Sequence, residues 1–161
     1  MGILNVTPDS FSDGGAHDTL FAAQAHARQM AEDGADILDI GGESTRPGGD
    51  PVSLEDEWAR VREPITRLAG PDALPISIDT YKAEIARRAA EAGAVLVNDV
   101  WGMTKDEGMA DAVAETESLV CITYNRGKTD GDIDLREDMT AFFGRAFDMA
   151  DRAGIPRAHP A

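Results

Sequence analysis

The chain has 161 residues, of which 42% are hydrophobic and 6% aromatic, and this composition indicates one folded domain with a buried core. Thirty acidic residues against fifteen basic ones give a formal net charge of −15, which excludes general binding to nucleic acid or to an anionic membrane surface. The sequence shows neither a membrane-spanning run nor a secretory signal pattern, and its one cysteine cannot form an internal disulfide, so we expect a cytoplasmic protein.

Five short apolar runs recur along the chain. Each is rich in Ile, Val and Leu at successive rather than alternating positions, which is typical of strands buried on both faces of a parallel sheet. The runs are residues 2–6, 36–41, 75–80, 94–100 and 118–124. Cys121 lies in the last run, and we predict that it is a buried, small apolar residue.

Helical patterns separate these runs. The first predicted helix begins at Asp18 or Thr19 and ends at Gly34, and its apolar face carries Leu20, Ala23, Ala27, Met30 and Ala31. The second follows Ser53 as N-cap, with acidic residues in its first turn that suit the helix dipole, and Pro64 is expected to kink or interrupt it. Further helices are predicted over 81–93, 105–117 and roughly 136–154.

Strict β-α alternation leaves two architectures, an open doubly wound sheet or a (β/α)₈ barrel. Polar residues follow almost every predicted strand, and a barrel gathers all these strand ends on one face, whereas an open sheet concentrates its chemistry at one switch point. The sequence therefore favours an α/β fold of the TIM-barrel class. Since it holds about five β-α units, we expect residues 1–161 to be a single, incomplete barrel domain, truncated before the sixth strand.

Two loops are unusually rich in Gly, Pro and small polar residues. They read NVTPDSFSDGG and GGESTRPGG, and such loops can donate N–H and O–H groups to phosphate and hold a divalent cation through oxygen atoms. Arg46 lies in the second loop of a very acidic chain, which favours a contact with an anion or one that locks the loop. Motifs for a P-loop, a dinucleotide fold or a nucleophile elbow are absent from the sequence.

Asp39, Asp79 and Asn98 each end an apolar run, so burying them without a partner would cost about 1–3 kcal/mol each. For Asp79 and Asn98 we predict a ligand, because a carboxylate beside an amide matches the edge of a pterin or purine ring. For Asp39, a structural network and a role in binding are equally compatible with the sequence.

Four segments resemble successive motifs of dihydropteroate synthase, the enzyme of folate biosynthesis that sulfonamides target. They are MGILNVTPDSFSDGG, ILDIGGESTRPGG, ISIDTYKAEIARRAAEAGA and LVNDVWG, and their order and spacing also agree. The similarity runs from Met1 to about residue 127 and continues weakly through the last predicted helix. It implies a TIM barrel that joins 6-hydroxymethyl-7,8-dihydropterin pyrophosphate to p-aminobenzoate, with Mg²⁺, in an enzyme that is a homodimer when complete.

The resemblance also implies roles for single residues. Asp79 and Asn98 hold the pterin as catalytic residues, Asp79 stabilising a cationic pterin as pyrophosphate leaves. Asp39 supports them, and Asn5 helps to hold Mg²⁺ and pyrophosphate. The first loop closes over the site through Asp9, Ser10 and Asp13. The p-aminobenzoate pocket is formed by Phe11, Thr45, Arg46 and Pro47.

The chain departs from the family pattern after the fifth strand, where a Met-His pair is usual and Thr123-Tyr124 stands here. The family's later Asp, Lys, Arg and His motifs do not occur in these 161 residues. Two alternatives therefore stay open: a pterin-binding methyltransferase domain that serves a corrinoid, and a non-catalytic pterin-binding half-barrel. The GGESTRPGG loop argues against the first, because methyl transfer needs no p-aminobenzoate pocket.

Overall fold

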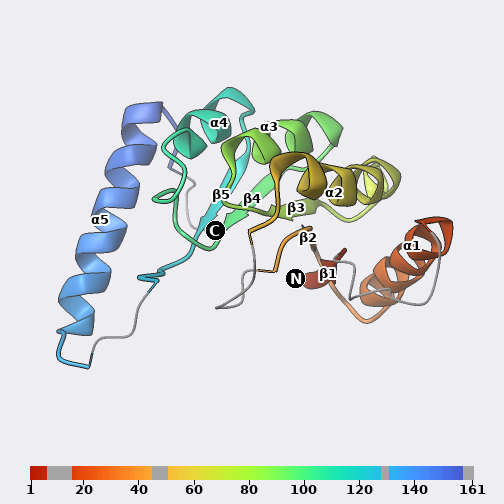
Figure 1. Ribbon diagram of the computed structural model, residues 1–161, viewed down its shortest axis with the longest axis horizontal. Helices are drawn as coiled ribbons and strands as arrows, with labels where there is room; N and C mark the ends of the chain where they lie inside the picture. The colour runs from red at the N-terminus through yellow and green to blue at the C-terminus, as the bar shows by residue number, and fades with distance from the viewer. Residues whose placement is uncertain (7–15, 45–50, 128–130, 158–161) are drawn as a thin grey trace.

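The computed structural model describes residues 1–6, 16–44, 51–127 and 131–157 (Figure 1). Five strands and five helices alternate in these ranges. In chain order they are β1 (Gly2–Asn5), α1 (Ala16–Glu32), β2 (Leu38–Gly41), α2 (Leu54–Leu68), β3 (Ile76–Asp79), α3 (Ala83–Ala92), β4 (Leu96–Asp99), α4 (Met109–Glu115), β5 (Leu119–Ile122) and α5 (Leu135–Ala153). Within these ranges, none of the helices combines the length and the apolar character needed to cross a membrane.

The strands form one parallel sheet in the order β1-β2-β3-β4-β5, so each strand pairs with its neighbour in sequence. An open doubly wound sheet reverses its strand order at a switch point, whereas a barrel adds strands in one direction. The observed order confirms the prediction of consecutive β-α units that wind in one direction, as in a barrel.

One face of the sheet packs against the helices and forms the core. Figure 1 shows α2, α3 and α4 side by side along this face. Parallel strands in register present the same face at paired positions, so one row of apolar side chains runs across the strands. Leu4, Ile40, Ile78 and Val97 make up this row, and each is at most 1% exposed. Burying such side chains stabilises the fold by about 1.5–3 kcal/mol each.

The opposite face, which we call the inner face, carries the alternate positions of the strands. Its first row is Ile3, Asp39, Ser77, Leu96 and Leu119, and its second row is Asn5, Gly41, Asp79, Asn98 and Cys121. Ile3 and Leu119 are 61% and 57% exposed, whereas Asp39 and Ser77, on the central strands, are buried. The inner face therefore joins a buried polar centre to exposed apolar edges.

Two helix ends agree with the predicted capping. The Ser53 hydroxyl accepts a hydrogen bond from the Asp56 backbone N–H at 3.1 Å, which fixes the start of α2. Helix α3 ends at Gly93, whose φ of +116° suits glycine, and a Cβ there would lie 2.6 Å from the Ala69 Cβ. Gly93 thus lets α3 end close against α2.

Several sequence predictions are corrected by the structure. All five strands are shorter than the predicted runs, and β5 is partly exposed because no described element covers its inner face, so Cys121 is exposed rather than buried. Helix α1 starts at Ala16, before the predicted caps Asp18 and Thr19. Ala31 lies on the exposed side of α1.

Pro64 does not interrupt α2, which continues from Leu54 to Leu68. A proline inside a helix costs about 3 kcal/mol because its ring crowds the preceding turn and it has no N–H to donate. Here Pro64 is buried between Val61 and Ile65, which are both 0% exposed. Their burial against the sheet offsets that cost, so packing decides the helix length.

Candidate functional site

The polar residues predicted at the strand ends come together on the inner face. Asn5 pairs with Gly41, Gly41 with Asp79, and Asp79 with Asn98. These four positions form one row across four strands, which we call the strand-end row. Asp39 precedes Gly41 by two residues and therefore points to the same face of β2. The parallel register gathers these residues because the carboxyl ends of all the strands lie at one edge of the sheet.

Asn98 and Asp39 are joined directly. The Asn98 Nδ2 donates a hydrogen bond to the Asp39 Oδ2 at 2.9 Å, across the 59 residues that separate them in sequence. Asp39 is 4% exposed, and its other oxygen, Oδ1, has no hydrogen-bond partner within the described part of the chain. The bond orients the Asn98 side chain, so the amide oxygen of Asn98 is free to point away from Asp39.

Asp79 is the last residue of β3, which lies between β2 and β4 in the sheet. Its Oδ1 has no partner among the described residues. Burial, followed by the negative charges of Asp39, Glu57, Asp99 and Glu43, raises the pKa of Asp79 to about 7. A buried carboxylate oxygen without a partner among the described residues can accept hydrogen bonds from the N–H groups of a ligand. A cationic ligand would favour the ionised form of Asp79.

The oxygen atoms around Gly41 could hold a cation that takes most of its other ligands from substrate phosphate and water. A Cβ on Gly41 would lie 3.4 Å from the Asp79 Oδ2 and 3.5 Å from the Asn5 Oδ1, so the absence of a side chain keeps the space between them open. Among the described residues, no three His, Cys, Asp or Glu side chains form a metal-binding group. Mg²⁺ often takes one or two protein oxygens and completes its shell with phosphate and water, and Asn5 fits that pattern.

Asp99 has a structural role, although it is adjacent to Asn98 in sequence. It is fully buried, and its two oxygens accept hydrogen bonds from the backbone N–H groups of Trp101 (2.8 Å) and Met103 (2.7 Å). Burial raises its pKa, and the two backbone bonds oppose that shift. These bonds hold the turn after β4, in which Met103 has a φ of +62°.

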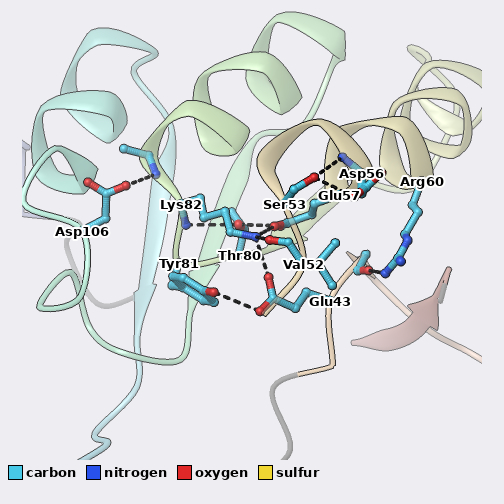
Figure 2. Close-up of polar contacts among 12 residues, drawn as sticks. Glu43, Val52, Ser53, Asp56, Glu57, Arg60, Thr80, Tyr81, Lys82 and Asp106 are labelled. Atoms are coloured by element: carbon cyan, nitrogen blue, oxygen red, sulfur yellow. Dashed lines mark hydrogen bonds and ion pairs between the residues drawn. The ribbon is translucent and has the colours of Figure 1, made fainter. Parts of the chain in front are cut away.

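A second group of polar residues lies behind the strand ends, between α2 and the start of α3 (Figure 2). We call it the Lys82 cluster, and it consists of Glu43, Glu57, Thr80, Tyr81 and Lys82 with the carbonyl of Val52. The Lys82 Nζ donates to the Glu57 Oε2 at 2.5 Å, to the Glu43 Oε2 at 2.6 Å and to the Val52 O at 2.6 Å. The three N–H groups of the ammonium are therefore all used.

The remaining carboxylate oxygens of the Lys82 cluster are satisfied as well. Thr80 Oγ1 donates to Glu57 Oε1 at 2.7 Å, and the Tyr81 hydroxyl donates to Glu43 Oε1 at 2.9 Å. Burial is the largest single influence on Glu43 and Lys82 and opposes their charged forms. The hydrogen bonds and opposite charges around each group together outweigh it, so the pKa of Glu43 is lowered and that of Lys82 is raised. Both groups are thus charged at neutral pH.

Sequence reasoning missed the Lys82 cluster. It assigned the acids at the start of α2 to the helix dipole, yet Glu57 is 1% exposed and paired with Lys82. One signal was present: the sequence has three lysines, and one of them, Lys82, lies two residues after the polar end of a predicted strand. This signal is weak, because a lysine before a helix usually faces solvent.

Tyr124 contacts α5 and not the strand-end row. Its hydroxyl donates a hydrogen bond to the Asp138 carboxylate on α5, and the Arg126 Nε lies 3.1 Å from the Asp138 Oδ2. The segment after β5 is thereby attached to α5. The predicted site residues of the two loops lie outside the described residues: Asp9, Ser10, Phe11, Asp13, Thr45, Arg46 and Pro47.

Consecutive β-α units with a polar row at the carboxyl ends of their strands define a portion of an α/β-barrel protein whose site lies at those ends. Residues 1–159 match the family of pterin-binding enzymes, and the chain belongs to that family.

Similar proteins agree with this assignment. The chain is 47% identical over 155 residues to the dihydropteroate synthase of Bacillus subtilis, covering 96% of this chain and 54% of that protein. A crystal structure of dihydropteroate synthase from Clostridium difficile in the presence of pteroic acid superposes with a TM-score of 0.93 at 47% identity, covering 98% of this chain and 60% of that one. The Xanthomonas albilineans dihydropteroate synthase with 4-aminobenzoic acid gives 0.88 at 47% identity, covering 97% and 57%.

The predicted resemblance and the barrel fold are thereby confirmed. The chain spans between half and two thirds of the length of these relatives. Its five units correspond to part of their barrel.

Proposed function

We propose that this chain provides the pterin-binding part of a dihydropteroate synthase. The reaction condenses 6-hydroxymethyl-7,8-dihydropterin pyrophosphate with p-aminobenzoate to give 7,8-dihydropteroate and pyrophosphate. The observation that carries the proposal is the buried Oδ1 of Asp79, which has no hydrogen-bond partner among the described residues, beside an Asn98 amide that Asp39 holds in place. The Clostridium difficile and Xanthomonas albilineans structures, with pteroic acid and 4-aminobenzoic acid, support it.

The strand-end row can bind one edge of a pterin ring. Asp79 accepts N–H groups of the ring, and the oriented amide of Asn98 offers both a donor and an acceptor. When pyrophosphate leaves the methylene group, positive charge develops on the ring, and the Asp79 carboxylate stabilises it at short range. The p-aminobenzoate amine then attacks the methylene carbon and loses a proton, while the pterin stays in place.

The other site residues predicted from the sequence complete this proposal. Asn5 contributes an oxygen for Mg²⁺, which when bound would neutralise the departing pyrophosphate. The first loop excludes water from the reacting carbon through Asp9, Ser10 and Asp13. The arylamine is bound by Phe11, Thr45, Arg46 and Pro47. We further propose that the five units and the rest of the barrel form one domain of a cytoplasmic homodimer.

The test is dihydropteroate formation by a fusion in which this chain replaces the matching 60% of the Clostridium difficile protein. We expect activity in the fusion, a loss of at least 100-fold in kcat/KM with Asp79→Asn, and little change with Asp72→Asn, an exposed residue outside the strand-end row. A folded fusion that binds the pterin but makes no product would favour the non-catalytic reading. Equal activity of the Asp79→Asn variant would remove Asp79 from the site.

A further inference from the structure

The residues Glu43 and Val52 lie on either side of the stretch 44–51, which contains Thr45, Arg46 and Pro47. Both accept a hydrogen bond from the same atom, the Lys82 Nζ. The Lys82 Nζ lies 2.6 Å from the Glu43 Oε2 and 2.6 Å from the Val52 O (Figure 2). One ammonium group therefore fixes the distance between the two ends of this stretch.

The third bond of Lys82 anchors this arrangement in the core. It runs to Glu57 of α2, which is 1% exposed and which also accepts a hydrogen bond from Thr80 at the end of β3. Thr80 itself directly follows Asp79 of the strand-end row. The ends of the stretch 44–51 are thus tied to the strand that carries the central carboxylate of the site.

Two carboxylates and a carbonyl converge on one lysine, and a second contact, from the Arg60 Nη1 to the Gly42 O at 2.8 Å, holds the same end from α2. Desolvating two carboxylates against one ammonium is costly, and an apolar contact would stabilise the fold equally well. What such an arrangement adds is a fixed geometry of hydrogen bonds.

We propose that Lys82 is a positioning residue for the arylamine substrate: through Glu43 and Val52 it holds both ends of the stretch 44–51 at a set place relative to Asp79. The assignment of the arylamine to this stretch rests on the proposed function. The tie formed by Lys82 rests on its three hydrogen bonds alone. The two parts are therefore tested by separate measurements.

The first measurement is hydrogen-deuterium exchange of the intact chain, read by mass spectrometry in peptides that cover residues 44–51. Glu43→Ala breaks one tie and leaves Lys82 and Glu57 as a neutral pair, so the variant is expected to fold. We expect exchange in this peptide to accelerate at least tenfold in Glu43→Ala and in Lys82→Met. In Glu43→Gln, which keeps an acceptor oxygen, we expect exchange close to the wild-type rate.

The control is Glu115→Ala, which removes an exposed ion pair between Glu115 and Arg87 that shares no residue with the Lys82 cluster. We expect no change in the exchange of residues 44–51 there. Exchange within twofold of wild type in Glu43→Ala would overturn the tie, whatever the activity of the protein. If Lys82→Met fails to fold, the comparison of Glu43→Ala with Glu43→Gln still decides it.

The second measurement uses the active fusion described above. We expect Glu43→Ala to raise the KM for p-aminobenzoate at least tenfold and to change the KM for the pterin pyrophosphate less than threefold, with recovery in Glu43→Gln. An equal rise in both KM values, together with faster exchange, would support the role of Lys82 in holding the ends of the stretch 44–51. It would refute the link between this role and arylamine binding. A fusion without any activity would count against the proposed function, and the exchange data would still stand as the test of Lys82.

Discussion

Replacing Asp79 with asparagine should stabilise the protein, and it should do so in a pH-dependent way. Burial and neighbouring acids raise the pKa of Asp79 from 3.8 to about 7. A raised pKa means that the folded state disfavours the ionised carboxylate, so wild-type stability falls as the pH rises from about 4 to about 7. Asparagine carries no charge, so the variant lacks this loss.

The size of the effect follows from the shift. At about 1.36 kcal/mol per pKa unit, a rise from 3.8 to about 7 corresponds to at most about 4 kcal/mol. The Asp79 side chain is partly exposed, and solvent screening roughly halves that value, so we expect about 2 kcal/mol at pH 8. At pH 4 the two proteins should differ by less than about 1 kcal/mol, because Asp79 is then protonated in the folded state and ionised only in part in the unfolded state.

Urea denaturation between pH 4 and pH 8.5 measures this difference, with the fluorescence of Trp58 and Trp101 as the signal. The free energies of unfolding of wild type and Asp79→Asn should diverge as the pH rises and run parallel above about pH 7.5. The variant Asp72→Asn, at an exposed position, serves as control and should follow wild type throughout. A gap between wild type and Asp79→Asn that is constant with pH, or that has the opposite sign, would refute the reasoning.

Three further outcomes follow from the same contacts. Lys82→Met should cost about 3–5 kcal/mol of unfolding free energy because it leaves buried Glu57 without its partner, and adding Glu57→Met should restore most of it, as measured by urea denaturation. Gly41→Val should place methyl groups against Asp79 and weaken pterin binding at least tenfold in calorimetry, while the melting temperature changes little. Asp99→Ala should cost about 2–4 kcal/mol, since two buried N–H groups lose their acceptor; a melting temperature equal to that of wild type would contradict this.

The strand-end row could be predicted because local signals and register agree. Asp39, Asp79 and Asn98 each follow an apolar run, and parallel strands in sequence order bring such positions together without any further information. The hydrogen bond from Asn98 to Asp39 gives Asp39 a structural contact, one of the two readings that the sequence allowed. Its Oδ1, which has no hydrogen-bond partner in the part of the chain that the structure describes, is compatible with the other reading, a role in binding.

The Lys82 cluster could not be predicted because each of its members has a simpler local explanation. Glu57 suits the first turn of a helix, and a lysine before a helix usually faces solvent. Their pairing depends on how closely α2 approaches the start of α3, which the packing of side chains sets. Pro64 and Cys121 show the same limit, since burial on α2 and exposure on β5 are decided by which elements cover them.

The sequential strand order also bears on how this protein is made. Each strand pairs with the one synthesised just before it, so every new β-α unit leaving the ribosome finds an edge already formed. Asp39 on β2 and Asn98 on β4 are hydrogen-bonded directly to each other, on either side of β3. The strand-end row of a nascent chain is therefore complete once β1 to β4 have emerged, well before a barrel can close around it.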